Sequence, residues 1–476
     1  MKIIVMKTRV INFIKSAVIV LALAGCSNDF LELEPTDSIS EDIVFDSYTT
    51  AKAALIGAYD QMSSVSFGGL YNPIVADIMG EDVMVNSVNN WNWFIPVYQM
   101  DVLPNYVYID SPWWAGFKLI YDANSIINNS VYIPDATTEQ IDELVGQARV
   151  LRAYSMLKLA QMYSPAYARN PDAESILLNI DPVDDLYTGF KRSKLSQVYA
   201  QIESDLLAAT SELEENDDKG FFDSRAAHAL LARLYLDMGE WESARDHAKL
   251  ASKDLELMTI NEMFSGFGIR NRETIYSIAY TQDDNNTFLT LPSFYWPVSG
   301  YSSMRANNVF VNEFTAADSR KSFFLKLDEI DPDRYLIVKF GHNNSIGNAE
   351  RICIRASEML LIEAECEAEL GNNSQAQDAL YQIQRRSNPG VSKSTSTGQA
   401  LIDEVLLERR KELFGEGFRW HDIKRRQLPF TRTGDHWVKL SFTAQDSDYF
   451  RLTFPIPQSE IDSNDSLENS DQNIGY

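Results

Sequence analysis

Apolar residues recur at every third or fourth position over several stretches of the chain, which is the spacing of one face of an α-helix. The longest such stretch covers residues 139–162, where Ile141, Leu144 and Leu151 follow this rhythm, and Pro165 ends it because proline cannot continue a helix. The same spacing predicts shorter helices over residues 55–62, 113–129 and 196–213. The body of the chain is therefore expected to consist of helices with long irregular insertions.

Residues 226–253 carry the alternation of small and large side chains that is typical of a tetratricopeptide helix pair. Small residues let two antiparallel helices cross closely, Gly239 is expected to form the turn, and Trp241 is expected to pack into the groove. A weaker copy of the pattern is carried by Ala364, Gly371, Ala376, Leu380 and Ile383. Residues 146–164 and 401–424 could supply further helices, since such repeats bury a continuous core only when several stack together.

Two long segments interrupt the helical pattern. Residues 63–110 hold three prolines and a Gly-Gly pair, and residues 260–350 hold only two short strand-like runs, at 275–280 and 336–340. Residues 425–454 are also irregular, and the tail after them is polar and rich in turn-forming residues. An irregular segment of this length inside a compact domain is usually functional.

Each of the two long segments contains an aromatic run with polar neighbours. Flat aromatic rings can stack on the apolar faces of sugar rings, and Trp and Tyr do so at little cost in side-chain entropy. The candidate ligand-binding side chains on these runs are Asn90, Trp91, Trp93, Tyr295, Trp296 and Tyr301. The alternative is that the aromatic residues only pin long loops to the scaffold, and the sequence leaves both open.

The charge balance argues against a nucleic-acid partner. The 476 residues include 42 Lys and Arg against 68 Asp and Glu, a formal charge of −26, and so acidic a chain repels a phosphate backbone. Only three cysteines occur, which is too few for a disulfide framework. Cys353 and Cys366 are expected to be buried free thiols.

The first 25 residues have the layout of a secretory signal, with four basic residues, no acidic residue and a short apolar run. The sequence Leu-Ala-Gly-Cys at residues 23–26 resembles a bacterial lipobox, in which Cys26 becomes the acylated N-terminus. We therefore expect a signal peptide at 1–25, a lipidated tether at 26–40 and one ligand-binding domain at 41–476. Because no later run reaches 18 apolar residues, we expect the protein to be anchored to a membrane without spanning it.

No motif for catalysis or cofactor binding is found. The zincin, nucleophile-elbow and phosphate-loop patterns are missing from the sequence, as are zinc and EF-hand spacings, so neither a metal nor a cofactor is predicted. The adjacent His421 and Asp422 are expected to be structural rather than a catalytic dyad. Arg149 and Arg152, together with the charged residues at 408–412, are expected to form ion pairs. A pair of glycosidase carboxylates cannot be identified from sequence, because their separation is a property of the fold.

Five separated segments resemble the SusD/RagB family of surface lipoproteins. Residues 146–154, Gly-Gln-Ala-Arg-Val-Leu-Arg-Ala-Tyr, are similar to the family's GEARFLRA helix, and Ile474 stands where the family usually has proline. The other segments are Cys26 onward with Phe30-Leu31 and residues 54–59, residues 357–365, residues 408–422, and residues 455–461 closing with 472–476.

This resemblance implies a single, mostly α domain, in which four tetratricopeptide-like helix pairs form the scaffold for long irregular loops and a few short strands. It also implies a non-enzymatic role in the outer membrane. Family members capture oligosaccharides or, in some branches, peptides, and deliver them to SusC-like TonB-dependent transporters. Two other readings remain open: a tetratricopeptide scaffold lipoprotein of the envelope, and a surface glycoside hydrolase.

Overall fold

A computed structural model describes residues 41–180, 189–298, 300–327, 331–341 and 346–476 of the chain. The predicted signal peptide, Cys26 and the predicted tether lie outside these residues. The described part is a single, mostly helical domain with a few short strands. Within it, no helix is both long and apolar enough to cross a bilayer.

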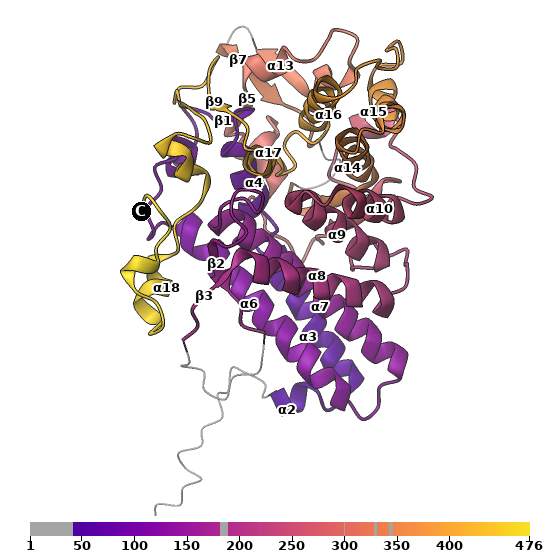
Figure 1. Ribbon diagram of the computed structural model, residues 1–476, viewed down its shortest axis with the longest axis vertical. Coiled ribbons are helices and arrows are strands. Elements are labelled where there is room, and N and C mark those ends of the chain that lie inside the picture. The colour runs from indigo at the N-terminus through magenta and orange to yellow at the C-terminus, as the bar shows by residue number, and fades with distance from the viewer. Residues whose placement is uncertain (1–40, 181–188, 299, 328–330, 342–345) are drawn as a thin grey trace, which may run out of the picture.

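A stack of antiparallel helices forms one side of the molecule, rising from α3 to α16 in Figure 1. Its members are α3 (Tyr48–Ser63), α6 (Val107–Asn129), α7 (Thr138–Tyr163), α8 (Leu195–Glu212), α9 (Ser224–Met238), α10 (Trp241–Ala251), α14 (Ala356–Glu369), α15 (Asn373–Ser387) and α16 (Gln399–Glu412). Each helix packs on the next as far as α14, which α15 and α16 both contact. The four helices predicted from apolar spacing are confirmed, although α3 and α6 begin seven and six residues earlier than the predicted stretches.

The two tetratricopeptide-like pairs are α9 with α10 and α14 with α15, as the spacing of small residues predicts. Gly239 and Gly371 follow α9 and α14 in the left-handed conformation, with φ of 80° and 77°, which glycine adopts without steric cost. Ala244 and Ala248 of α10 are fully buried, so α10 can lie close to its neighbours. Trp241 is half-buried against the core.

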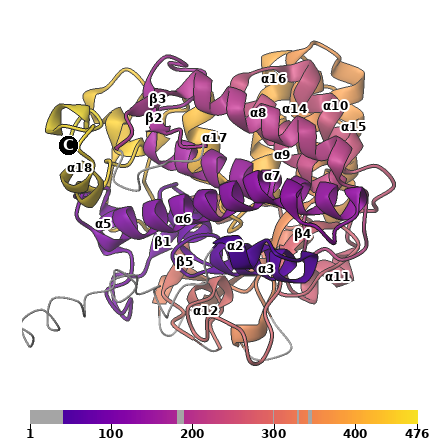
Figure 2. The ribbon, with the colours of Figure 1, turned by 90° about the horizontal axis from the view of Figure 1, so that it is seen from below.

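The long segments that interrupt the stack fold into a layer of short helices and strands. Its helices are α4 (Tyr71–Ile78), α5 (Ile95–Gln99), α11 (Ile260–Phe264), α12 (Leu291–Tyr295) and α13 (Asn308–Val311). Its strands are β1 (Val83–Val85), β4 (Thr274–Ile278), β5 (Met304–Ala306), β6 (Phe324–Leu327), β7 (Asp331–Ile337) and β8 (Arg351–Arg355). Figure 2 shows β5 and α12 on the opposite side of α7 from α8.

The strands of this layer pair in antiparallel fashion. One sheet has the order β1-β5-β7-β6, in which Val83 lies opposite Ala306 and Ala306 lies opposite Tyr335. A second sheet joins β4 to β8, with Ile278 opposite Arg351. The remaining pairs are β2 (Glu174–Leu177) with β3 (Arg192–Lys194) and β9 (Phe430–Thr431) with β10 (Ser441–Phe442).

The C-terminal part contains the helices α17 (Arg419–Arg426) and α18 (Gln458–Ser463) and the 3-10 helices η5 (Ser447–Leu452) and η6 (Asn469–Asp471). Figure 2 places α18 at one end of the molecule, far from α15. Among the described residues, the other short helical turns are α2 (Glu41–Val44), η2 (Ser130–Tyr132), η3 (Ser319–Phe323) and η4 (Ile346–Asn348).

Two predictions about the irregular segments need correction. Residues 63–110 are not uniformly irregular, because Pro73 falls in the first turn of α4, where backbone N–H groups have no intrahelical partner to lose. The strand predicted at 336–340 ends at Ile337. Beyond that point Lys339 turns into the interior, where its ammonium donates to the carbonyl oxygen of Phe414 at 2.7 Å.

A network of buried charges joins the helix stack to this layer. Glu412 at the end of α16 accepts hydrogen bonds from Arg320 at 2.9 Å and from Arg355 at 2.8 Å, and from Arg386 on α15. All four side chains are at least nine-tenths buried. Burial alone would raise the pKa of Glu412, but the three guanidinium groups hold it well below its usual value.

The ion pairs predicted from sequence are confirmed. Arg152 donates to both oxygens of the fully buried Asp205, and Arg149 lies 3.1 Å from Glu212. In the 408–412 segment, Glu408 pairs with Arg320 at 2.6 Å, and Arg409 and Arg410 pair with Asp422 and Asp82. Cys353 and Cys366 are buried and free, also as predicted.

Replacing Glu412 by glutamine should destabilise the protein by about 3–5 kcal/mol, because three buried arginines lose their shared counter-charge. Chemical denaturation measures this loss. The matched control is Glu256→Gln, since Glu256 is 77% exposed and its one ion pair among the described residues is with Arg272 on the surface. That change should cost at most about 1 kcal/mol.

The contribution of Glu412 should also depend on pH. Its pKa is lowered on folding, so its stabilising effect is complete above the unfolded value of about 4.3 and is lost as the pH falls through the folded value. The difference in unfolding free energy between wild type and Glu412→Gln should therefore shrink in acid. A difference that is constant from pH 7 to pH 3 would contradict this assignment.

Candidate functional site

The two aromatic runs singled out in the sequence meet at one place in the layer. The ring centroid of Trp93 lies 5.6 Å from that of Phe294 and 5.6 Å from that of Tyr301. Trp91 lies 6.2 Å from Tyr301 in an edge-to-face arrangement. Segments 200 residues apart thus form one aromatic cluster, in the geometry that aromatic pairs prefer.

The cluster has an exposed top and a buried base. Trp91 is 68% exposed, while Trp93 and Tyr301 are half-buried and Phe94 and Phe294 are inaccessible to solvent. We call the solvent-facing residues Trp91, Trp93 and Tyr301 the aromatic platform. Their rings are supported from below by packed phenylalanines, so a flat apolar ligand face could stack on them with little reorganisation.

The loop that carries the platform has an unusual backbone. Asn89, Trp91, Asn92 and Phe94 all have φ between 55° and 62°, in the left-handed region that side chains other than glycine seldom adopt. Such residues persist only where the surroundings hold them, and they gather at functional sites. Here the backbone N–H of Phe94 donates to the hydroxyl of Tyr108 at 3.0 Å.

Asn90 holds this loop together. Its amide nitrogen donates to the carbonyl oxygen of Asn86 at 2.8 Å, and its amide oxygen accepts from the N–H of Asn92 at 2.8 Å. Arg334 of β7 donates to the side chains of Asn86 and Ser87 at 2.6 and 2.9 Å. The geometry gives Asn90 a structural role, and its contact with a ligand stays a prediction.

The structure does not agree with the predicted place of Tyr295 in a ligand site. It ends helix α12 rather than lying on a loop, it has no exposed surface, and its hydroxyl donates to Asp77 at 2.8 Å. Burial raises the pKa of Tyr295 well above its usual value and raises that of Asp77 to about 7. The sequence showed a turn-rich run around Pro297 but not that α12 rotates this ring inward.

Trp296 lies beside Tyr295 but packs differently. It is half-buried, and its six-membered ring covers Gly341 so closely that a Cβ there would come within 3.2 Å. Its proposed contact with a ligand is not tested by this packing and stays a prediction.

A further tryptophan at this edge was not picked out from the sequence. The indole N–H of Trp437 donates to the carbonyl oxygen of Val85 at 2.8 Å, immediately before the loop that carries the platform. Its ring lies 5.0 Å from that of Tyr98 and is 36% exposed. No local pattern could have revealed this, because 352 positions separate Trp437 from Val85 in the chain.

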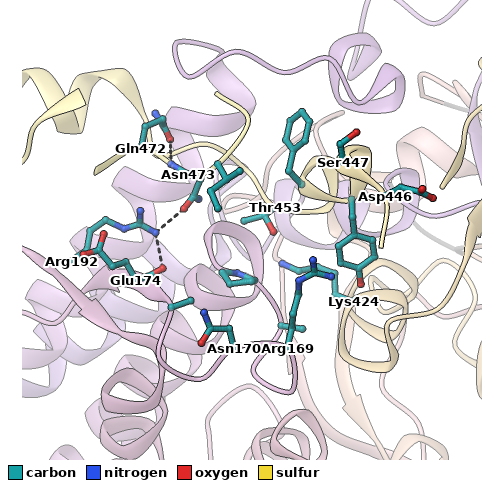
Figure 3. A pocket seen from close by; sticks show the side chains of 16 residues that line it. Arg169, Asn170, Glu174, Arg192, Lys424, Asp446, Ser447, Thr453, Gln472 and Asn473 are labelled. Atoms are coloured by element: carbon teal, nitrogen blue, oxygen red, sulfur yellow. Dashed lines mark hydrogen bonds between the residues drawn. The ribbon is translucent and has the colours of Figure 1, made fainter. Parts of the chain in front are cut away.

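A second feature is a cavity of about 480 Å³ between the segment that follows α7 and the C-terminal tail. Figure 3 shows Arg192 along one wall with Gln472 and Asn473, and Arg169 and Lys424 away from it. We call this space the tail cavity. This cavity could not be predicted from sequence, since its walls come from five separate segments.

The cations of the tail cavity are bonded to neutral oxygen atoms. Arg192 donates to the carbonyl oxygens of Glu174, Ser175 and Asp471 and to the amide oxygen of Asn473, at 2.7–2.8 Å. Lys424 donates to two carbonyl oxygens at the end of α7. Burial lowers the pKa of Lys424 to about 7 and that of Arg192 to about 10.

His421 and Asp422 do not form a dyad. The carboxylate of Asp422 accepts from Arg409 at 3.0 Å and from Arg425 at 2.8 Å, so it serves as a counter-ion. His421 is half-buried, and its partial removal from water lowers its pKa well below the usual value. The ion pairs of Asp422 agree with the structural role expected from sequence, and that of His421 stays a prediction.

The sequence model of the SusD family matches residues 331–476, and a model described as "Starch-binding associating with outer membrane" matches residues 29–236. A SusD-like protein of Bacteroides ovatus is 24% identical to this chain, over 86% of this chain and 82% of the relative.

Solved structures show the same fold. A SusD superfamily protein of Bacteroides thetaiotaomicron superposes with a TM-score of 0.82 at 26% identity, covering 90% of this chain and 99% of that one. A SusD-like carbohydrate-binding protein of Bacteroides vulgatus superposes with a TM-score of 0.78 at 25% identity, covering 90% and 98%.

The burial of Tyr295 can be tested by Tyr295→Phe. Removing the hydroxyl leaves the buried Asp77 without one of its donors, which should cost about 1–3 kcal/mol of stability. Chemical denaturation measures the cost, and Tyr132→Phe is the control, because Tyr132 is 76% exposed. Equal stability of the two variants would contradict a structural role for the Tyr295 hydroxyl.

Proposed function

This chain belongs to the SusD/RagB family, and from that premise we propose that it is a cell-surface lipoprotein that captures oligosaccharides. It delivers them to a SusC-like TonB-dependent transporter of the outer membrane. Family models over residues 29–236 and 331–476 and the shared fold support this function. The name of the carbohydrate-binding relative at 25% identity supports a glycan as cargo.

The aromatic platform is the observation that carries the proposal. Sugar rings present apolar C–H faces with hydroxyls at their edges, and Trp91, Trp93 and Tyr301 offer supported aromatic surface for those faces. Trp91 has no other evident use, because two thirds of its surface faces solvent while its backbone is held in a strained conformation. Exposed and rigid aromatic side chains give contact area at low entropic cost.

Capture rather than catalysis fits the chemistry of this site. The platform side chains can stack and hydrogen-bond but carry no acid, base or nucleophile suited to cleaving a glycosidic bond. Delivery to a transporter requires release, so we expect reversible binding of modest affinity. Peptide cargo is the alternative outcome, and a ligand panel that includes peptides decides between them.

The anchor belongs to the same proposal. Acylation of Cys26 after removal of residues 1–25 would tether the domain to the outer membrane, and more than one acyl chain is needed for a stable anchor. The family model that matches residues 29–236 describes an association with the outer membrane, which supports this location.

Loss of Trp91 should abolish most glycan binding without unfolding the protein. For Trp91→Ala we expect the affinity for the best glycan of a calorimetric panel to fall about tenfold or more, equivalent to about 1.4 kcal/mol. The melting temperature should change little, since most of the side chain is exposed. The matched control is Trp114→Ala, because Trp114 is 63% exposed on α6 outside the platform. Binding that survives Trp91→Ala, or falls equally in both variants, would rule out the platform as the glycan site.

Cys26→Ser should release the protein from the membrane. Without the thiol no acyl chain can be attached, so the variant should move from the outer-membrane fraction to a soluble fraction. Metabolic labelling with a fatty acid and cell fractionation measure this, with Cys366→Ser as the control, because Cys366 is a buried thiol of α14. Unchanged membrane association of Cys26→Ser would argue for a different anchor.

A further inference from the structure

The tail cavity contains binding groups that the fold itself does not use. It is lined by the segment after α7, by β3, by α17, by η5 and by the C-terminal tail, and it shares no residue with the aromatic platform. Its volume of about 480 Å³ lies within the usual range for small-molecule sites. A binding site in this cavity goes beyond the glycan capture that we propose for the aromatic platform.

Arg169 is the first of these groups. The centre of its guanidinium lies 4.6 Å from the centroid of the Tyr449 ring, and one terminal nitrogen donates to the carbonyl oxygen of Ala444 at 2.8 Å. These contacts orient the planar fork and leave its other N–H groups without an acceptor among the described residues. A guanidinium held in this way is arranged to bind a carboxylate through two parallel hydrogen bonds.

The hydroxyl of Tyr449 is the second group. Tyr449 is only 7% exposed, yet within the described ranges its hydroxyl oxygen has no hydrogen-bond partner. Buried polar groups without a partner are few in native proteins, and each calls for an explanation. Because Tyr449 lines the cavity, a ligand that reaches this wall can supply the acceptor.

The electrostatic setting favours an anion. Arg169, Arg192 and Lys424 line the cavity, and none of them forms an ion pair with a described carboxylate. Two acidic residues also line it, but Glu174 is exposed and one carboxylate oxygen of Asp446 is bonded to the N–H and hydroxyl of Thr443. This cationic lining stands out in a chain whose formal charge is −26.

We propose that the tail cavity binds a carboxylate-bearing small molecule. The carboxylate lies on the free edge of the Arg169 guanidinium and accepts a further bond from the Tyr449 hydroxyl. Asn170, Ser447 and Thr453, which also line the cavity, face the polar remainder of the ligand. This chemistry is found in uronic-acid oligosaccharides and at the carboxyl terminus of a short peptide.

Calorimetric titration of the purified full-length protein in detergent tests the proposal. The probes are a digalacturonate, its neutral galactose analogue, an N-acetylated dipeptide with a free carboxyl group and the amide of that dipeptide. One carboxylate probe should bind saturably and its uncharged analogue at least about tenfold more weakly, because a charged acceptor strengthens the bonds to arginine. Binding of the digalacturonate identifies the source as a sugar acid, and binding of the dipeptide identifies it as a peptide.

Variants then locate the binding. Arg169→Gln should weaken it about tenfold or more, and Tyr449→Phe, which keeps the ring under Arg169, should weaken it about threefold. Arg272→Gln is the matched control, because Arg272 is a surface arginine paired with Glu256 and Glu262. If Arg169→Gln fails to fold, the effect of Tyr449→Phe on the affinity decides alone whether the probe binds in the tail cavity.

The outcomes separate this site from the platform. Binding that is unchanged in both cavity variants, or equally strong for the uncharged probes, overturns the proposal, as does no saturable binding of either carboxylate. Trp91→Ala should leave carboxylate binding intact. The proposal for the tail cavity can therefore be overturned while the proposal of glycan capture stands, and glycan capture can be overturned while the tail-cavity proposal stands. If Trp91→Ala weakens binding of the carboxylate probe as much as the cavity variants do, the probe binds on the platform and the proposal of a separate site is overturned.

Discussion

The buried carboxylate of Glu412 is the point on which this architecture depends. Three arginines from separate parts of the chain, Arg320, Arg355 and Arg386, converge on it. A charge removed from water is tolerated only when it is paired and hydrogen-bonded. Each of the three arginines is therefore held where it can reach Glu412. The segments that carry them are held in place as well, and these are η3, the end of β8 and the end of α15. The helix stack and the irregular layer are joined by charge pairing as well as by apolar packing.

The same pairing extends to the strand beside the aromatic platform. Arg410 and Arg419, which flank the end of α16, bind Asp82 and Glu81 immediately before β1. The loop with the left-handed residues begins directly after that strand. Its strained backbone can persist because both ends are held, by these ion pairs on one side and by the packing of Phe94 on the other. Rigidity of the platform is thus a consequence of buried electrostatics some distance away.

The two candidate sites differ in how they are built. The platform uses aromatic side chains from two runs, and its selectivity would come from shape and from hydroxyl contacts at the ring edges. The tail cavity uses an arginine that stacks on a tyrosine whose hydroxyl has no partner among the described residues. A protein that stacks neutral sugar faces at one site and binds a carboxylate at another could recognise an acidic glycan at two points.

The sequence alone determined the helical scaffold, because periodic apolar positions and small-residue spacing such as Gly239 with Ala244 are local consequences of helix geometry. It also identified the aromatic runs and the family. Only the tertiary structure decided that Trp91 faces solvent whereas Tyr295 is buried on Asp77, since a short helix sets which ring turns inward. Sequence reasoning could not predict the tail cavity either, because only long-range packing brings Arg169 and Arg192 to the same space as Tyr449, which lies in a distant part of the chain.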